Sequence, residues 1–108
     1  MAKVIEPGEK FHTKNTIEYS EGAVVSKTII KKTGGNVTLF AFDKDQELSE
    51  HSSPHEALVQ VLDGKVEITI GGQPHTIPEG ESIILPANIP HALKAVEAFK
   101  MVLVMIKS

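Results

Sequence analysis

The sequence has no cysteine, no arginine and no tryptophan, and aromatic residues make up only 5% of its 108 residues. Without cysteine there can be no disulfide, thiolate zinc site, iron–sulfur cluster or cysteine nucleophile. All 11 basic residues are lysines, so no guanidinium is present to bind phosphates or guanine edges through two parallel hydrogen bonds. The net charge is −3. These features argue against nucleic acid as a partner and disfavour an oligophosphate substrate.

Long apolar runs are also missing. No stretch approaches the roughly 20 apolar residues that cross a bilayer as a helix. Residues 1–10 are polar and lack the apolar core of a signal peptide. We therefore expect a cytoplasmic protein with no membrane partner. A chain of 108 residues has the length of one ordinary domain, so residues 1–108 are interpreted as a single unit.

What the sequence does contain is an excess of β-branched residues: valine, isoleucine and threonine together number 28. Such side chains are stiff and pack well on a pleated surface, which predicts a sheet protein. Turn residues recur at the spacing of a sandwich or small barrel, and no segment has a sustained helical stripe. The predicted strands are 23–31, 37–43, 57–62, 65–70, 73–77, 82–85, 91–95 and 99–106. Residues 1–22 are predicted to form an edge strand or a strap.

Two turns between predicted strands have sequences typical of tight hairpins. Asp63-Gly64 separates two strands of alternating pattern, and Gly71-Gly72 follows the second of them. Both pairs supply the positive φ angles that a two-residue reversal requires. Each pair is therefore predicted to reverse the chain into an antiparallel neighbour.

Some predicted strands are apolar on both faces. Residues 101–106 alternate between two sets of apolar side chains, and residues 58–62 are nearly as apolar. A sheet in a small monomer usually leaves one face wet. This pattern favours a homodimer, in which the second apolar face packs on a partner subunit. The alternative is a strand buried between two layers and the N-terminal strap.

Five histidines are the main candidates for a chemical role. His12 and His75 lie in polar surroundings and are interpreted as surface residues. His51 and His55 flank a short turn just before an apolar strand, and His91 opens another strand. Two histidine-bearing turns that feed neighbouring strands can place imidazoles at one mouth of a barrel, where neutral rings can bind first-row metals.

At these turns the sequence resembles the small single-domain cupins. The stretch HSSPHEALVQVLDG (residues 51–64) is similar to their first motif, and GESIILPANIPH (residues 80–91) to their second. The resemblance covers residues 39–106. It implies an all-β fold, an antiparallel double-stranded β-helix of the jelly-roll kind. It does not fix an activity, because the superfamily includes dioxygenases, isomerases, decarboxylases, storage proteins and sensors.

The first cupin motif is only partly present. Its first histidine corresponds to His51, but its second corresponds to Ser53, which is a poor metal ligand. Counting back from Gly64, the acidic ligand position falls on Ala57. Glu56 is one residue away and, by strand alternation, is expected to point to the opposite face.

The second motif supplies His91, and the polar position that follows it in the family corresponds to Ala95. His55 is the candidate third ligand. His51, His55 and His91 would then hold a divalent first-row metal (Zn, Ni, Fe, Mn or Cu), weakly or at low occupancy. The alternative is a metal-free barrel in which His51 and His91 hydrogen-bond each other or a water.

Strand alternation predicts a largely apolar interior below these histidines. Binding sites are usually concave and apolar, with a few convergent polar groups. A small, partly apolar ligand with a carboxylate or enol group would suit such a lumen, although side chains can also fill a small barrel completely. The residues predicted to line a ligand site are Ser53, Ala57, Val59, Val61, Leu93 and Phe40.

Three functions remain open from the sequence. The first is a barrel that binds a small molecule, with or without a weak histidine-held metal. The second is a metal-dependent enzyme, dioxygenase-like or isomerase-like, acting on a small organic substrate. The third is a structural dimer without a ligand. The replacement of two family ligands by Ser53 and Ala57 favours the first and third.

Overall fold

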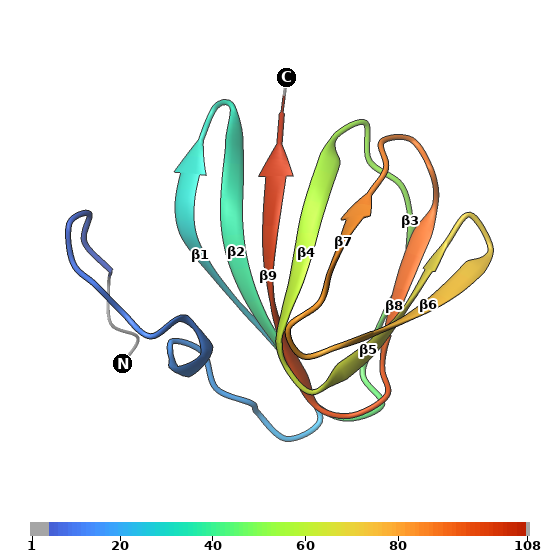
Figure 1. Cartoon of the computed structure of the whole chain (residues 1–108), viewed down its shortest axis with the longest axis horizontal. Helices are drawn as coiled ribbons and strands as arrows, with labels where there is room; N and C mark the ends of the chain where they lie inside the picture. Colours follow the sequence, from blue (N-terminus) through green and yellow to red (C-terminus); the bar gives the residue numbers. More distant parts are fainter. Residues whose placement is uncertain (1–4, 108) are drawn as a thin grey trace.

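The computed structural model describes residues 5–107, which form nine strands in two facing sheets (Figure 1). The first sheet has the order β1-β2-β9-β4-β7 and the second has the order β3-β8-β5-β6, with all neighbours antiparallel. The strands are β1 (Val24–Lys32), β2 (Gly35–Phe42), β3 (Glu47–His51), β4 (Glu56–Asp63), β5 (Lys65–Ile70), β6 (Gln73–Pro78), β7 (Ser82–Leu85), β8 (His91–Ala95) and β9 (Phe99–Ile106).

The expected all-β jelly-roll barrel is confirmed. The strands converge at one end of the barrel and diverge at the other, where the C-terminus lies (Figure 1). In the described part of the chain, the one helical element is a short 3-10 turn, Thr13–Asn15. No helix among these residues is long and apolar enough to cross a membrane.

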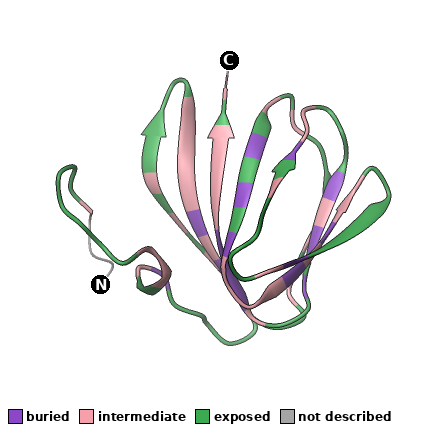
Figure 2. Cartoon of the chain, viewed as in Figure 1, coloured by how far each residue is buried: buried purple, intermediate pink, exposed green. Residues whose placement is uncertain are grey.

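The core fills the space between the two sheets. Along β4, exposed and buried residues alternate without exception over six positions, which is visible as green and purple bands in Figure 2. This is the period-2 pattern of a strand with one face in the core. At the narrow end, Phe42 and Phe99 stack with ring centroids 4.6 Å apart and close the barrel. Phe40, which the sequence places in the lining of the lumen, is half-buried and packs against the same core.

The sequence did not predict β3. Its five residues are mostly polar and exposed, and Leu48 is the one apolar member. The pairing of β3 with β8 shifts between Leu48 and His51, so that three steps along β3 match two along β8. Such a β-bulge turns the following residue back to the same face of the sheet. His51 therefore shares the inner face with Leu48.

The Asp63-Gly64 hairpin prediction is wrong. β4 and β5 lie in different sheets and do not pair, so the chain crosses from one sheet to the other at Gly64. Gly64 has φ +73°, and a Cβ there would lie 1.9 Å from the carbonyl oxygen of Ala98. The positive φ redirects the strand rather than reversing it. Gly71-Gly72, by contrast, does form the predicted hairpin, between β5 and β6.

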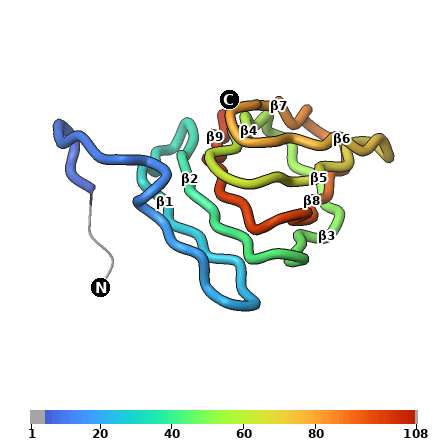
Figure 3. Tube along the Cα trace, turned by 60° about the horizontal axis from the view of Figure 1, so that its bottom comes forward, coloured from blue at the N-terminus to red at the C-terminus, as the bar shows by residue number. Residues whose placement is uncertain are grey.

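Described residues 5–22 form a strap rather than an edge strand, and they extend away from the barrel beside β1 (Figure 3). Ile17 is the anchor, since it packs with Leu39 and Ala41 on the outer face of β2. Residues 1–4 of the predicted strap lie outside the described part of the chain.

A polar contact joins the strap to the narrow end of the barrel. The Tyr19 hydroxyl donates a hydrogen bond of 2.6 Å to Asp63, and the Lys14 ammonium lies 3.4 Å from the same carboxylate. Lys100, which is buried, donates to the Lys14 carbonyl and lies over the Tyr19 ring. The hydrogen bond from Tyr19 and the charge of Lys14 lower the pKa of Asp63. Burial and Asp63 raise the pKa of Tyr19.

Candidate functional site: a histidine pair at the wide end of the barrel

His51 and His91 lie side by side at the wide end of the barrel. His51 ends β3 and His91 begins β8, and their Cα atoms are direct cross-strand partners. The two ring centroids are 4.5 Å apart, with the planes at 67°. This arrangement places both imidazoles at one mouth, as the sequence predicts. His91 is 7% exposed, whereas His51 is open to solvent.

Each ring is oriented by a backbone carbonyl two residues earlier in the chain. Nδ1 of His51 lies 2.8 Å from the Ser49 carbonyl oxygen, and Nδ1 of His91 lies 3.3 Å from the Ile89 carbonyl oxygen. A carbonyl oxygen can only accept, so Nδ1 carries the proton in both rings. In the neutral pair, both Nε2 atoms are therefore left with a free lone pair.

The surroundings of His91 favour its neutral imidazole. Burial lowers the pKa of His91, and the neighbouring His51 lowers it further by like-charge repulsion. The hydrogen bond to Ile89 acts in the opposite direction but is the smaller effect. Near neutral pH, His91 is thus an acceptor through Nε2.

The predicted three-histidine metal site is not formed. Within residues 5–107, no group of three or more histidine, cysteine, aspartate or glutamate side chains is arranged to hold a metal ion. His55 is half-buried on the loop after β3, where its backbone amide donates to the Ser53 hydroxyl. Glu56 cannot replace it, because it faces outward next to Ile106, as strand alternation predicted.

Five of the six residues predicted to line a ligand site belong to the inner core of the barrel or pack against it. Four of them belong to the buried core, namely Ala57, Val59, Val61 and Leu93, and Phe40 packs against that core. Ser53 is half-buried on the loop, and its carbonyl accepts a hydrogen bond of 2.7 Å from Asn88. This bond ties the loop that follows His51 to the loop that precedes His91.

The inward-facing side chains beside the histidine pair are half-buried, unlike the fully buried core residues named above. The direct cross-strand neighbour of His91 on β5 is Ile70, and Leu48 precedes His51 on β3. Met105 lies opposite Ala57 at the same end of the barrel. The sequence alone did not single out Leu48, because the strand β3 and its bulge were not predicted.

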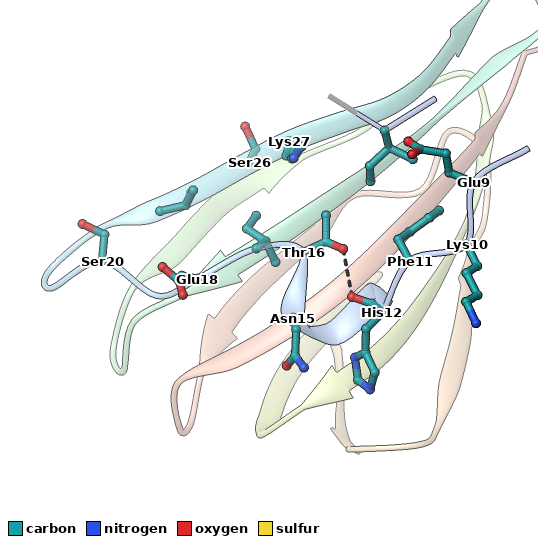
Figure 4. Close-up of a pocket in the computed structure, with 13 residues that line it drawn as sticks. Glu9, Lys10, Phe11, His12, Asn15, Thr16, Glu18, Ser20, Ser26 and Lys27 are labelled. Carbon is teal, nitrogen blue, oxygen red and sulfur yellow. Dashed lines mark hydrogen bonds between the residues drawn. The ribbon is translucent and has the colours of Figure 1, made fainter. Parts of the chain in front are cut away.

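A separate groove of about 740 Å³ lies outside the barrel, between the strap and β1 (Figure 4). Phe11 and His12 lie on the strap side, and Ser26 and Lys27 on the β1 side. The Thr16 hydroxyl donates to the His12 carbonyl and stabilises the turn that forms the floor of the groove. His12 and His75 are exposed, His12 on the strap and His75 on β6, which β5 separates from β8.

A comparison with protein families matches residues 38–107 to the cupin domain. The chain belongs to the cupin family. Among solved structures, a conserved protein of unknown function from Streptococcus pyogenes is 38% identical to this cupin, with a TM-score of 0.91, over 99% of this chain and 94% of that chain. No curated protein gives a sequence match.

Two further structures extend the comparison. A cupin 2 conserved barrel domain protein from Leptotrichia buccalis is 42% identical, with a TM-score of 0.87, over 90% of this cupin and 47% of that longer chain. A cupin superfamily protein from Desulfitobacterium hafniense has a TM-score of 0.90 at 22% identity, over 100% of this chain and 99% of that chain. At that identity, the likeness is one of fold alone.

Proposed function

We propose that this cupin binds a small molecule at the wide end of its barrel, with the His51–His91 pair as the polar anchor. The observation that carries the proposal is the matched pair of Nδ1 contacts to the Ser49 and Ile89 carbonyls. These contacts orient both rings, and in the proposed binding mode both Nε2 atoms accept hydrogen bonds from the ligand. The half-buried apolar residues beside the pair would contact the rest of the ligand.

The hydrogen-bonding character of the pair defines the class of ligand. Two neutral Nε2 atoms accept and do not donate, so the ligand must bring a hydroxyl, enol or amino hydrogen. An anionic group such as a carboxylate would meet two lone pairs and no donor. The ligand is therefore a small, partly apolar molecule with at least one donor group.

A metal is not required for this role. The two Nε2 atoms are a good partial donor set for Zn, Ni, Fe, Mn or Cu, but catalytic zinc sites usually take three protein ligands. Ala57 and Ser53 occupy the positions where cupins supply the others. We propose that a first-row metal binds here weakly and exchanges readily. A stoichiometric metal retained after purification without a nickel column would instead support the alternative of a metal-dependent enzyme.

Matched probes test the proposal. Phenol carries one donor on an apolar ring, and anisole is the same ring with the donor capped by a methyl group. We expect phenol to shift the NMR signals of both histidines in metal-free protein, and anisole to shift them much less. Equal binding of the two compounds would contradict an acceptor pair. Retained phenol binding in both His51→Ala and His91→Ala would place the site elsewhere.

We also propose that the protein is a cytoplasmic homodimer. The dimer is supported by four exposed apolar residues on the outer face of the five-stranded sheet, namely Ile30, Leu58, Ile84 and Ile106, which are 41–61% exposed. Soluble monomers rarely leave a large contiguous apolar patch in water. A structural dimer without a ligand remains the alternative if neither phenol nor metal binds.

A further inference from the structure

The outer face of the five-stranded sheet carries one apolar row that crosses every strand. Each member is the direct cross-strand partner of the next, in the order β1, β2, β9, β4, β7. No charged or polar residue interrupts the row. Its members are Ile30, Val37, Val104, Leu58 and Ile84. Figure 2 shows the upper end of β1 as exposed. On β7, Ile84 is exposed and the last residue, Leu85, is buried.

The strap flanks this row at its β1 end, beside Ile30, and leaves Leu58 and Ile84 exposed. Ile17 covers the neighbouring part of the face nearer the narrow end, where Leu39 is fully buried. Beyond Leu39 the face is uncovered, and Leu58 and Ile84 are 41% and 61% exposed. The apolar surface continues past β1 into a groove of about 350 Å³ that Phe11 and Ile30 help to line.

We infer that this row is the homodimer interface, and that it packs on the same row of a second copy about a two-fold axis along β9. The inference rests on the proposed homodimer and assigns its surface. With the axis in that position, Ile30 faces the partner's Ile84 and Val37 faces the partner's Leu58. Val104 lies at the axis and faces the partner's Val104. The row is self-complementary because β9 is the central strand and both of its flanks are apolar.

Charge complementarity supports this axis. The next row on the same face, toward the wide end, contains Lys32 on β1 and Glu56 on β4, with Gly35 and Ile106 between them. The same two-fold axis places the partner's Glu56 opposite β2, the strand next to Lys32. Measured across the strands, the two residues are then offset by one strand spacing, about 4.8 Å. Neither residue has an ion-pair partner in the described part of its own chain. Two such pairs would flank the apolar row.

Sedimentation equilibrium provides the first test. The wild-type mass is expected at twice 11.7 kDa. Leu58→Glu and Ile84→Glu should each weaken the dimer by about 100-fold or more, because each buries a charge in the interface. Val96→Glu is the matched control, because Val96 is 42% exposed on the β8–β9 turn, and it should leave the dimer intact.

The outcomes separate the two proposals. A monomeric wild type would overturn the homodimer and this interface together. A dimeric wild type whose Leu58→Glu and Ile84→Glu variants stay dimeric would overturn this interface alone. Charge exchange adds a second criterion: Lys32→Glu and Glu56→Lys should each weaken the dimer about two- to fivefold, and the double variant should restore it.

A cross-linking variant keeps the test decisive if a glutamate substitution unfolds the barrel. The wild-type chain has no cysteine, so Val104→Cys introduces a single thiol, which the two-fold axis places opposite its own copy. A short bismaleimide should convert this variant to covalent dimer, because facing sheets pack about 10 Å apart. Val96→Cys should remain monomeric on the gel. Equal cross-linking of the two variants would contradict the interface.

Discussion

His51 and His91 face each other across β3 and β8 with ring centroids 4.5 Å apart, and a carbonyl two residues earlier holds Nδ1 of each ring. The two rings therefore lie side by side and make the same kind of Nδ1 contact to the backbone. Outer contacts of this kind fix the tautomer and the orientation of a histidine before any ligand arrives. The pair is preorganised to accept hydrogen bonds.

Removing either imidazole is expected to abolish binding and leave the fold standing. The barrel is held by its apolar core, to which His51 contributes little because it is exposed. His51→Ala should therefore unfold at nearly the wild-type temperature while losing its response to phenol. His75→Ala on β6 is the control and should bind phenol normally. Loss of binding in the control would indicate a general effect on the barrel.

Stability should fall as the pH is lowered through the histidine range. The pKa of His91 is lowered in the folded state from an ordinary value of 6.5, so the unfolded chain binds the proton more readily. The free energy of unfolding therefore rises with pH across the interval below about 6.5 and levels off above it. Urea denaturation between pH 5 and 7.5 measures this, and His91→Gln should flatten the slope. An unchanged slope in the variant would contradict the role of His91.

Gly64 should not tolerate a side chain. An alanine there would meet the Ala98 carbonyl oxygen at 1.9 Å and would also have to adopt φ +73°. Gly72 provides a matched control, because it has φ +83° but no atom within 4 Å of the position that a Cβ would take. Gly72→Ala should cost only the conformational penalty of about 1–2 kcal/mol. Gly64→Ala should cost clearly more in thermal or urea unfolding, and equal losses would count against the close approach.

The contact between Tyr19 and Asp63 should hold the strap to the barrel. Tyr19→Phe removes one hydrogen bond to a carboxylate and, at this partly exposed site, is expected to cost about 1 kcal/mol. Residues 5–22 should then be cleaved faster by a protease, while the barrel stays resistant. A cycle with Asp63→Ala isolates the contact: the double variant should lose less than the sum of the two singles. Strict additivity would mean that the two residues act independently.

Much of the barrel could be predicted because its strands obey simple local rules. The alternation on β4 and the Gly71-Gly72 turn both follow from residue type alone. The failures arose where tertiary contacts override the local pattern. Gly64 looks like a hairpin turn in sequence, but the Ala98 carbonyl next to it belongs to a distant part of the chain. β3 is polar and could not be recognised without its partner β8.

The site was predictable in part for the same reason. The two motifs predicted that His51 and His91 lie close together, but the expected reason was wrong. The apolar strand that follows His51 is β4, which lies in the other sheet from β8. The two histidines are brought together by the pairing of β8 with β3, the strand that His51 ends. The bulge that turns His51 inward depends on pairing register, which the sequence does not show. The Ser49 and Ile89 contacts are made by backbone carbonyls, whose positions leave no trace in residue identity. The apolar row on the outer face likewise cannot be recognised until the order and register of the five strands are known.

The most direct test of the account is a long-range ¹H–¹⁵N spectrum of the histidine side chains in metal-free protein at pH 7.5. We expect His91 to be neutral and both rings to carry a proton on Nδ1, and we expect phenol to shift both Nε2 signals much more than anisole does. A proton on Nε2 of either ring, or equal shifts with phenol and anisole, would contradict the claim that the pair binds ligands as two acceptors.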